Sequence, residues 1–280
     1  MSLLLQVSDT HFGTERPEVV SALQRLAGRL QPDVLVVSGD ITQRARPAQF
    51  EAARRFFDSL RIPKLLAIPG NHDISLFNPF SRLFMPYRRY SRCFGNNLEP
   101  ELELPDLLLM MLNTTRRWRH VDGQLSPRQI DRVARRLRAA KPSQLRVVVT
   151  HQPIAVCTTI DRHNLLHGHR RAIEVWSAAG ADLLLGGHIH LPYIRPLHEN
   201  HPSWVVQAGT AVSSRIRHEA GNSINLIRTG DSAAGQHVGP ATARKAIVER
   251  WDFNDAVGEF VVHEQQSLAC GPVRPPKPDR

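Results

Sequence analysis

Cysteine is scarce in this sequence of 280 residues: Cys93, Cys157 and Cys270 stand far apart and form no CxxC pair. An odd, scattered set of thiols excludes a disulfide-stapled scaffold and favours a reducing compartment. Long apolar runs are also missing, because no stretch approaches the roughly 20 residues needed to span a bilayer. The apolar run at Leu3–Leu5 is too short for a signal-peptide core. We therefore expect a cytoplasmic protein without a membrane span.

Acidic residues are outnumbered by basic ones. The sequence has 36 Lys and Arg against 26 Asp and Glu, which gives a net charge of +10 and a pI near 10.5. A basic surface attracts anions, so nucleic acid, anionic lipid and phosphorylated metabolites are all compatible partners. Hydrophobic residues make up 41% of the chain, which is enough for a large core and excludes a disordered protein.

Short apolar runs alternate with helical patterns over the first two thirds of the chain. The runs that predict strands are Leu3–Val7, Val34–Val37, Leu65–Ile68, Leu107–Leu112, Val147–Val149 and Leu183–Leu185. Apolar residues at helical spacing lie between several of them, and residues 126–129 have the N-cap, proline and glutamine of a helix start. The last third changes to strands without helices, at Trp204–Gln207, Ser223–Ile227, Ile247–Trp251 and Phe260–His263. These patterns predict an α/β fold with two sheets flanked by helices.

One connection is too long for an ordinary loop, because residues 75–105 join the third and fourth predicted strands. Aromatic residues recur there at intervals of three or four, so we predict a small, partly helical lid over the site. The lid contains Arg88 and Arg89. Contact with a substrate phosphate and a solvated role are equally open for these arginines. Residues 1–265 are predicted to form one domain, and residues 266–280, which end in a proline-rich stretch, a disordered tail.

Five short polar motifs follow predicted strands. They are Asp9-Thr10-His11, Gly39-Asp40, Gly70-Asn71-His72-Asp73, His151 and Gly187-His188-Ile189-His190. Ligands of open α/β sheets bind outside the carboxyl ends of strands, so the five motifs are expected to converge on one edge. In extended backbone, side chains two apart point the same way, so Asp9 and His11 can hold one ion together. Carboxylate, imidazole and amide ligands without thiolate suit Mn, Fe or Zn.

The ordered set of motifs carries this prediction, because a single His or Asp at a strand end is more often an ordinary loop residue. Two ions about 3.5–4 Å apart clamp a phosphate, acidify a bridging water and stabilise both the attacking and the leaving oxygen. A single aspartate shared by both ions would hold that spacing. His163, His167 and His169 mimic a metal motif but precede a predicted helix, so we expect surface or supporting roles for them.

The series Asp-x-His, Gly-Asp, Gly-Asn-His-Asp, His and Gly-His-x-His resembles that of the calcineurin-like metallophosphoesterases, from Leu3 to about Thr210. The resemblance implies a four-layer sandwich of two mixed β-sheets flanked by helices, and two divalent metal ions. It assigns Asp9, His11, Asp40 and His190 to one ion, and Asp40, Asn71, His151 and His188 to the other, with Asp40 as the bridge. It also implies that His72 protonates or stabilises the leaving oxygen, and that Asp73 orients His72.

Within that superfamily the chain is most similar to bacterial class III cyclic-nucleotide phosphodiesterase-type enzymes. This likeness predicts hydrolysis of cyclic nucleotides or similar diesters, a small phosphoester substrate, by in-line attack of metal-bound hydroxide. A phosphomonoesterase, a nuclease and a lipid-precursor pyrophosphatase would use the same metal centre. Asn113, after the fourth strand, either shapes the substrate pocket or is an ordinary turn residue. A non-catalytic interaction module is the alternative of another class, but all seven predicted ligands are present.

Overall fold

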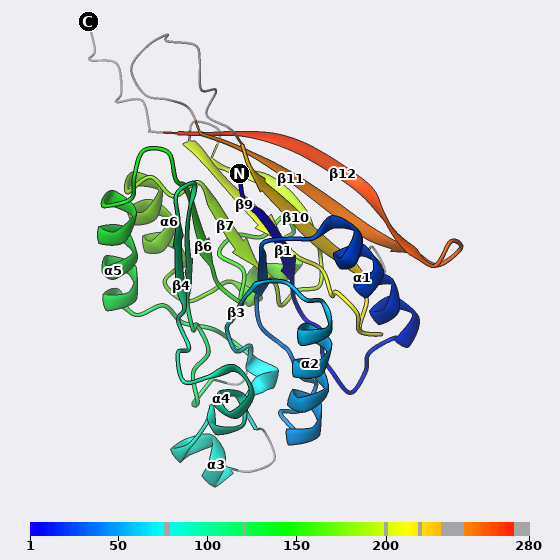
Figure 1. Cartoon of the computed structure of the whole chain (residues 1–280). Coiled ribbons are helices and arrows are strands. Elements are labelled where there is room, and N and C mark those ends of the chain that lie inside the picture. Colours follow the sequence, from blue (N-terminus) through cyan, green and yellow to red (C-terminus); the bar gives the residue numbers. More distant parts are fainter. Residues whose placement is uncertain (76–78, 120, 199–200, 218–219, 231–243, 272–280) are drawn as a thin grey trace, which may run out of the picture.

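Two six-stranded sheets form the centre of the molecule (Figure 1). The computed structural model describes residues 1–75, 79–119, 121–198, 201–217, 220–230 and 244–271. The first sheet contains β1 (Leu3–Val7), β2 (Val34–Val37), β3 (Lys64–Ala67), β10 (Ser223–Thr229), β11 (Arg244–Asn254) and β12 (Glu259–Cys270). Its order is β12-β11-β10-β1-β2-β3. The strands β1, β2 and β3 are parallel, whereas β10, β11 and β12 pair antiparallel, so the sheet is mixed.

The second sheet is also mixed and has the order β4-β5-β6-β7-β9-β8. Its strands are β4 (Glu101–Leu104), β5 (Leu107–Met111), β6 (Leu145–Val149), β7 (Leu183–Gly186), β8 (Tyr193–His198) and β9 (His201–Gln207). The four central strands are parallel, and the edge strands β4 and β8 pair antiparallel with their neighbours. The carboxyl ends of the parallel strands in this sheet therefore meet at one edge.

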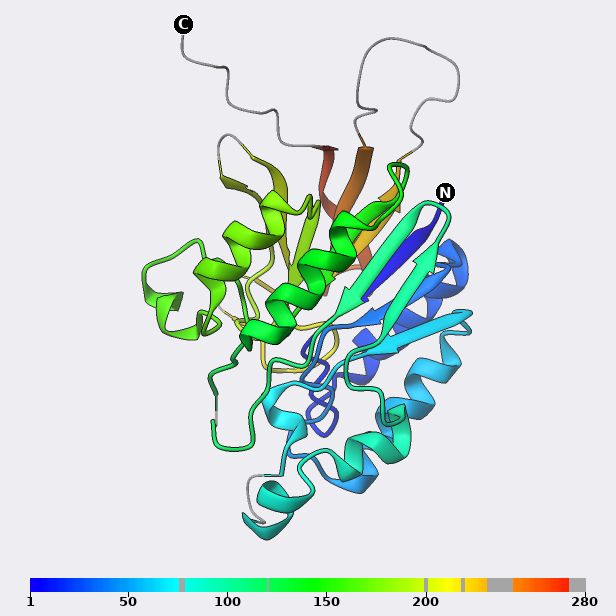
Figure 2. The ribbon, with the colours of Figure 1, turned by 90° about the vertical axis from the view of Figure 1, so that its left-hand side faces the viewer.

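Helices cover the outer face of each sheet (Figure 2). On the first sheet lie α1 (Pro17–Leu30) and α2 (Pro47–Ser59), and on the second lie α5 (Pro127–Arg138) and α6 (His169–Ala178). A third apolar cluster fills the space between the sheets, where residues such as Leu4, Val36 and Val147 are fully buried. The predicted α/β four-layer sandwich is confirmed. None of the helices in the described ranges combines the length and hydropathy that a bilayer crossing requires.

The edge strands are where the sequence prediction failed. Strand β4 was included in the predicted lid, because its alternating sequence ELEL is exposed on one side and lacks an apolar run. Strand β8 contains Pro196 and was not predicted at all. The predicted tail began too early: β12 continues to Cys270, and its residues 266–270 pair with β11. Residues 272–280 of that tail lie outside the described residues.

The 75–105 insertion is partly helical, as predicted, with α3 (Pro79–Phe84) and α4 (Arg88–Phe94) preceding β4. Its anchor is Tyr90, which is fully buried and donates a hydrogen bond of 2.7 Å to the carbonyl oxygen of Ala67. The ring of Phe94 packs against those of Phe50 and Phe57 on α2. Thus α4 belongs to the core of the first sheet, and α3 extends beyond it.

A buried ion pair joins the two sheets at the end where β6 and β11 begin. The guanidinium of Arg244 binds both carboxylate oxygens of Asp182 at 2.8 Å, and the backbone amide of Arg146 donates to the same carboxylate at 2.9 Å. The side chains are only 6% and 1% exposed. Removing one partner from such a pair leaves an uncompensated charge in the interior.

We predict that Asp182→Ala lowers the free energy of unfolding by about 3–5 kcal/mol, because the guanidinium of Arg244 stays buried without a counter-charge. The double variant Asp182→Leu with Arg244→Met should regain most of that loss. Chemical denaturation of both variants measures the effect. As a control, Arg132→Ala breaks an exposed pair with Glu99 and should stay close to wild type. Equal stability of Asp182→Ala and the control would contradict the role of the pair.

Candidate metal centre

The structure brings all seven predicted metal ligands together at the carboxyl ends of five strands. Asp9 follows β1, Asp40 follows β2, Asn71 lies in a 3-10 turn after β3, His151 follows β6, and His188 and His190 follow β7. Of these side chains, those of Asp9, His11 and His151 are wholly inaccessible to solvent. The predicted convergence of the motifs therefore holds, but the strands that carry them belong to two sheets rather than to one.

Asp9, His11 and His190 form the first group of candidate ligands, and their ligand atoms all lie within 4.8 Å of one another. Oδ1 of Asp9 is 3.8 Å from Nε2 of His11 and 3.3 Å from Nε2 of His190. The two imidazole nitrogens are 3.1 Å apart. Three donor atoms thus point at one another from the ends of two different strands.

A second group contains Asp40, His151 and His188, again within 4.8 Å. Nε2 of His151 is 3.3 Å from Oδ1 of Asp40 and 3.2 Å from Oδ1 of Asn71. The other carboxylate oxygen of Asp40, Oδ2, is 3.8 Å from Nε2 of His11 in the first group. Asp40 therefore lies between the two groups, with one oxygen facing each.

Unsatisfied buried atoms test whether these residues fit a pair of cations. Oδ1 of Asp9 and Nδ1 of His188 are buried and have no hydrogen-bond partner among the described residues. Leaving a buried polar atom unpaired is costly, and charged atoms cost most. A cation in each group would give both atoms a partner, and the oxygen and nitrogen donors without sulfur suit borderline divalent ions. The residues present therefore fit two such ions.

Four of the six ionisable candidate ligands have protonation states that suit metal binding. Burial disfavours the charged form of Asp9 and of Asp40, but neighbouring histidines outweigh burial and hold both pKa values below the ordinary range. Burial lowers the pKa of His11 to about 3, and burial together with His151 lowers that of His188 to about 4. His151 and His190 differ, because Asp40 and Asp9 overcome the effect of burial: the pKa of His151 is raised to about 9, and that of His190 is raised above its ordinary value. Ionised carboxylates and neutral imidazoles are the forms that ligate metals, so a cation would displace the protons of these two rings.

The backbone holds these side chains in an uncommon conformation. Five of the candidate ligands have positive φ angles: Asp9 (52°), His11 (41°), Asp40 (48°), His188 (75°) and His190 (56°). The extended backbone predicted for Asp9 and His11 is therefore wrong, although the two side chains do meet. Non-glycine residues in this left-handed region cost of order 1–3 kcal/mol each and cluster at functional sites. Asp and His tolerate it better than branched residues, which matches the residue types here.

The predicted role of Asp73 in orienting His72 is wrong. Both carboxylate oxygens of Asp73 accept hydrogen bonds from backbone amides. The donors are Gly70 at 2.9 Å in its own loop, and Ile41 at 3.0 Å and Thr42 at 2.8 Å in the loop after β2. The Nδ1 atom of His72 instead lies 2.9 Å from the carbonyl oxygen of Gln43. Asp73 thus ties the loop after β3 to the loop after β2, and Gln43 fixes the imidazole.

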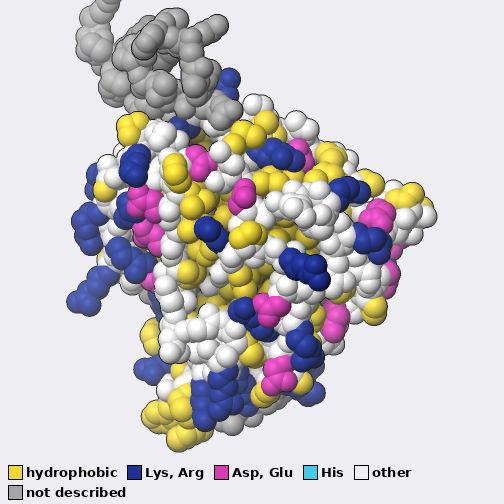
Figure 3. Space-filling model, in the orientation of Figure 1, with side chains coloured by type: hydrophobic (Ala, Val, Ile, Leu, Met, Phe, Trp, Pro, Cys, Tyr) yellow, Lys and Arg dark blue, Asp and Glu magenta, His cyan; other side chains and the backbone are white. Residues whose placement is uncertain are grey.

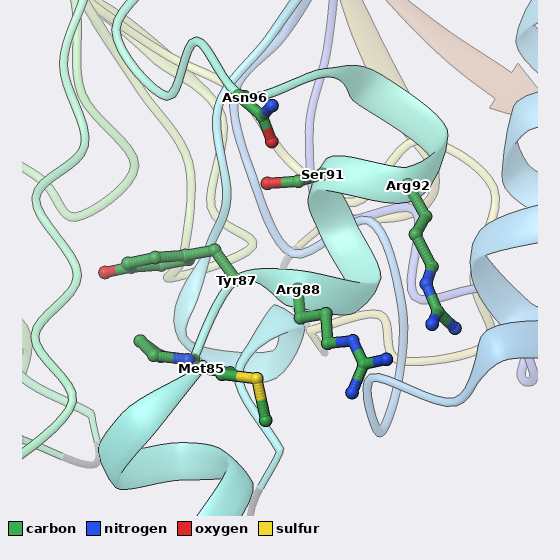
Figure 4. A pocket seen from close by; sticks show the side chains of 7 residues that line it. Met85, Tyr87, Arg88, Ser91, Arg92 and Asn96 are labelled. Atoms are coloured by element: carbon green, nitrogen blue, oxygen red, sulfur yellow. The ribbon is translucent and has the colours of Figure 1, made fainter.

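The predicted substrate contacts lie away from the ligand cluster. Arg88 lines a separate cavity of 460 Å³ with Met85, Tyr87, Ser91 and Asn96, whose side chains Figure 4 shows around α4 and its N-terminal end. Nη1 of Arg89 donates to the carbonyl oxygen of Ala45 at 2.9 Å. The Oδ1 atom of Asn113 accepts from the amide and hydroxyl of Thr115. Substrate binding by Arg88, Arg89 and Asn113 stays a prediction.

A cavity of 410 Å³ opens directly on the cluster and is lined by Asp40, Asn71, His72, His188 and His190. Residues that the sequence analysis missed complete its wall, namely Arg215, Arg217 and Asp161; His163, expected to have only a supporting role, also lines it. Nη1 of Arg215 lies 3.2 Å from Nε2 of His72 and 3.4 Å from the ring nitrogens of His11. Arg217 donates to Asp161 at 2.9 Å. Both arginines lie in the loop between β9 and β10, well past the strand end at Gln207, so the strand-end rule does not locate them.

Comparisons with known proteins agree with this geometry. The chain matches the family described as Calcineurin-like phosphoesterase over residues 3–192. It is 25% identical over 211 residues to a 3′,5′-cyclic-nucleotide phosphodiesterase of Nostoc sp., a match covering 71% of this chain and 75% of that protein. A glycerophosphodiester phosphodiesterase of Enterobacter lignolyticus is 43% identical over 84 residues, but this match spans only 25% of the present chain and 29% of that enzyme.

Solved structures share the whole architecture. A dimetal phosphatase from Danio rerio superposes with a TM-score of 0.64 at 12% identity, covering 96% of this chain and 99% of that one. Purple acid phosphatase PPD1 from yellow lupin gives 0.65 at 10% identity, covering 96% and 53%. At such identities the likeness shows the fold alone. The family match extends over more than half of the sequence, and the chain therefore belongs to the calcineurin-like phosphoesterase family.

Proposed function

We propose that the protein is a phosphodiesterase that depends on two divalent metal ions. The observation that carries the proposal is the position of Asp40, whose two carboxylate oxygens face two separate groups of histidines at 3.3 and 3.8 Å. Asp9, His11, Asp40 and His190 would hold one ion, and Asp40, Asn71, His151 and His188 the other. Mn, Fe and Zn all suit this donor set.

Such a pair of ions polarises a phosphoryl oxygen and lowers the pKa of a bound water, so that a nucleophile forms at neutral pH. The chain's own residues would then position the phosphate and the leaving group. Two histidines of the cluster have backbone partners that fix their rings: Nδ1 of His151 faces the carbonyl oxygen of Ser38 at 2.9 Å, and Nδ1 of His190 faces that of Arg215 at 2.5 Å. Each ring is thereby oriented with Nε2 toward the cluster.

Arg215 is proposed to bind the phosphate. Its guanidinium lies at the mouth of the cluster and contacts Gln43 at 3.2 Å as well as His11 and His72. Arginine suits phosphate because its planar group donates two parallel hydrogen bonds. Arg217 lines the same cavity, where its bond to Asp161 sets its direction. A diester with a single negative charge would meet one exposed guanidinium next to the metal ligands.

His72 is proposed to assist departure of the leaving oxygen. With Nδ1 held by the carbonyl oxygen of Gln43, its Nε2 faces the cavity and Arg215. The side chains of His11, Asp40 and His72 also place ligand atoms within 4.8 Å of one another, so a role for His72 as a ligand is a competing interpretation. Measuring metal content and turnover in the same His72 variant distinguishes a metal ligand from a residue that assists the leaving group.

Cyclic nucleotides are the proposed substrates, with other small diesters as the next choice. Support comes from the Nostoc relative, which is named a 3′,5′-cyclic-nucleotide phosphodiesterase, and the Enterobacter relative is named for a glycerophosphodiester. A phosphomonoesterase would require the same cluster. The test is a panel of 3′,5′- and 2′,3′-cyclic nucleotides, glycerophosphodiesters, bis-p-nitrophenyl phosphate, p-nitrophenyl phosphate and single-stranded DNA. Faster turnover of monoesters than of every diester would reject the phosphodiesterase.

The first prediction from this site concerns metal content. Purified protein should carry about two transition-metal ions per chain, and Asp40→Ala should lose both together with activity, because Asp40 is shared between the groups. Elemental analysis measures this directly. The matched control is His167→Ala, which removes an imidazole lying outside both groups and should keep both ions. Retention of one full ion by Asp40→Ala would reject the shared ligand.

His72→Asn should keep full metal content and lose activity in proportion to the difficulty of the leaving group. General acid assistance contributes typically about 10²–10⁴ in rate, and a ribose oxygen needs it more than p-nitrophenolate does. Turnover on a cyclic nucleotide and on bis-p-nitrophenyl phosphate, measured beside metal content in one preparation, separates the interpretations. If His72→Asn loses metal, His72 is a ligand. If the variant keeps its metal and hydrolyses both substrates equally slowly, His72 does not assist the leaving group.

Arg215→Gln should lower kcat/KM for all phosphate substrates by roughly tenfold to a hundredfold, since a hydrogen bond to a charged group contributes about 1.5–3 kcal/mol. Arg215→Lys keeps the charge but loses the planar fork, so it should recover only part of the activity. Steady-state kinetics and metal analysis of both variants provide the test. Unchanged kcat/KM in Arg215→Gln with intact metal content would show that the guanidinium does not touch the phosphate.

A further inference from the structure

A cluster of large apolar side chains is exposed where the insertion extends beyond the core. Its members are Phe80 (66% exposed), Leu83 (50%), Phe84 (61%) and Met85 (40%) on and after α3, and Trp118 (68%) on the neighbouring turn. Among the described residues, every exposed phenylalanine and tryptophan belongs to this cluster. Exposed apolar groups scattered singly need no explanation, but a contiguous set marks an interaction site.

Hydrogen bonds make α3 and the turn at residues 116–119 one surface, which we call the α3 surface. Arg82 donates to the carbonyl oxygens of Arg117 at 2.8 Å and Arg119 at 2.7 Å, and Arg117 donates back to that of Leu83 at 2.8 Å. The rings of Phe80 and Phe84 pack against each other at a tilt of 43°, with centroids 4.7 Å apart. The apolar side chains are thus presented together by a fixed frame.

The charge of the α3 surface is mainly positive. Residues 74–98 contain Arg82, Arg88, Arg89 and Arg92 and no carboxylate. Residues 114–121 contain Arg116, Arg117 and Arg119 and no carboxylate, and Asp122 just beyond them pairs with Arg119 at 3.5 Å. On α5, by contrast, Arg132 and Arg136 are paired with carboxylates, namely Glu99, Glu101 and Glu103. Figure 3 shows hydrophobic side chains beside Lys and Arg at the lower end of the molecule, where Figure 1 places α3.

We propose that the α3 surface docks the protein onto an anionic lipid bilayer. The aromatic and aliphatic side chains would enter the headgroup region, and exposed Arg88, Arg92 and Arg117 would contact lipid phosphates. Exposed Phe, Trp and Leu combined with arginine is the composition of interfacial membrane sites. No catalytic residue takes part, so this proposal is independent of the metal centre.

Two other occupants fit the surface less well. A second copy of this chain in a symmetric dimer would bring the same arginines against each other, because a two-fold interface joins identical patches. Nucleic acid would satisfy the arginines, but interfaces with DNA are more polar than protein interfaces. Leu83, Phe84 and Met85 would gain nothing from a phosphate backbone. A bilayer satisfies both the charge and the apolar groups at once.

Vesicle sedimentation of the full chain tests the proposal. The protein should sediment with phosphatidylcholine vesicles that contain phosphatidylglycerol, more weakly at high salt, and hardly at all with phosphatidylcholine alone. The variant Phe84→Ser with Trp118→Ser should bind at least about tenfold more weakly. Arg88→Gln with Arg92→Gln should lose about fivefold for each arginine removed. All four residues are exposed, so thermal melting should be unchanged.

Matched controls lie on other faces. Arg135→Gln with Arg138→Gln removes the same charge from exposed positions of α5, and Val257→Ser with Val262→Ser removes exposed apolar groups from the β11–β12 region. Both controls should bind vesicles like wild type. Absence of wild-type binding, equal loss in the controls, or a dimer broken by Phe84→Ser with Trp118→Ser would overturn the proposal. The proposal would also be overturned if the protein bound single-stranded DNA through these arginines and did not bind vesicles.

Discussion

Two ionised carboxylates buried side by side set the main constraint on this molecule. Asp9 and Asp40 are each nearly inaccessible to solvent, and burial alone would force them to become protonated. The surrounding histidines keep them charged, and the resulting cluster still leaves Oδ1 of Asp9 without a partner. Cations are the simplest remaining source of compensation. Parallel strands from two sheets end around these carboxylates, and the cavity opens on them.

Most of the fold could be predicted because its strands are buried on both faces. The runs at Leu3–Val7 and Val34–Val37 are wholly buried, so their sequences are continuously apolar. Edge strands carry no such signal, since β4 alternates charged and apolar residues and β8 contains a proline. The extra length of β12 was missed for a similar reason, because half of the strand is exposed and residues 263–267 are all polar.

The convergence of the candidate ligands was predictable from the order of their motifs, whereas the contacts around them were not. Sequence adjacency suggested that Asp73 serves His72, but the short turn points the carboxylate back to the amides of Ile41 and Thr42. Arg215 comes from a loop more than 140 positions after His72 in the sequence, so only the folded chain brings the two side chains together. Long-range contacts between loops leave no local pattern to read.

The left-handed backbone at Asp9, His11, Asp40, His188 and His190 also bears on how the protein acquires metal in a cell. These conformations are supported by loop hydrogen bonds, such as that from the amide of His11 to the carbonyl of Asp40 at 3.0 Å, and the apolar core lies elsewhere. Hydrogen bonds within the chain thus hold the backbone of the candidate ligands. Nitrogen and oxygen donors discriminate weakly between neighbouring transition metals, and intrinsic affinity rises toward copper. Cellular supply at the time of synthesis would then decide which metals occupy the site.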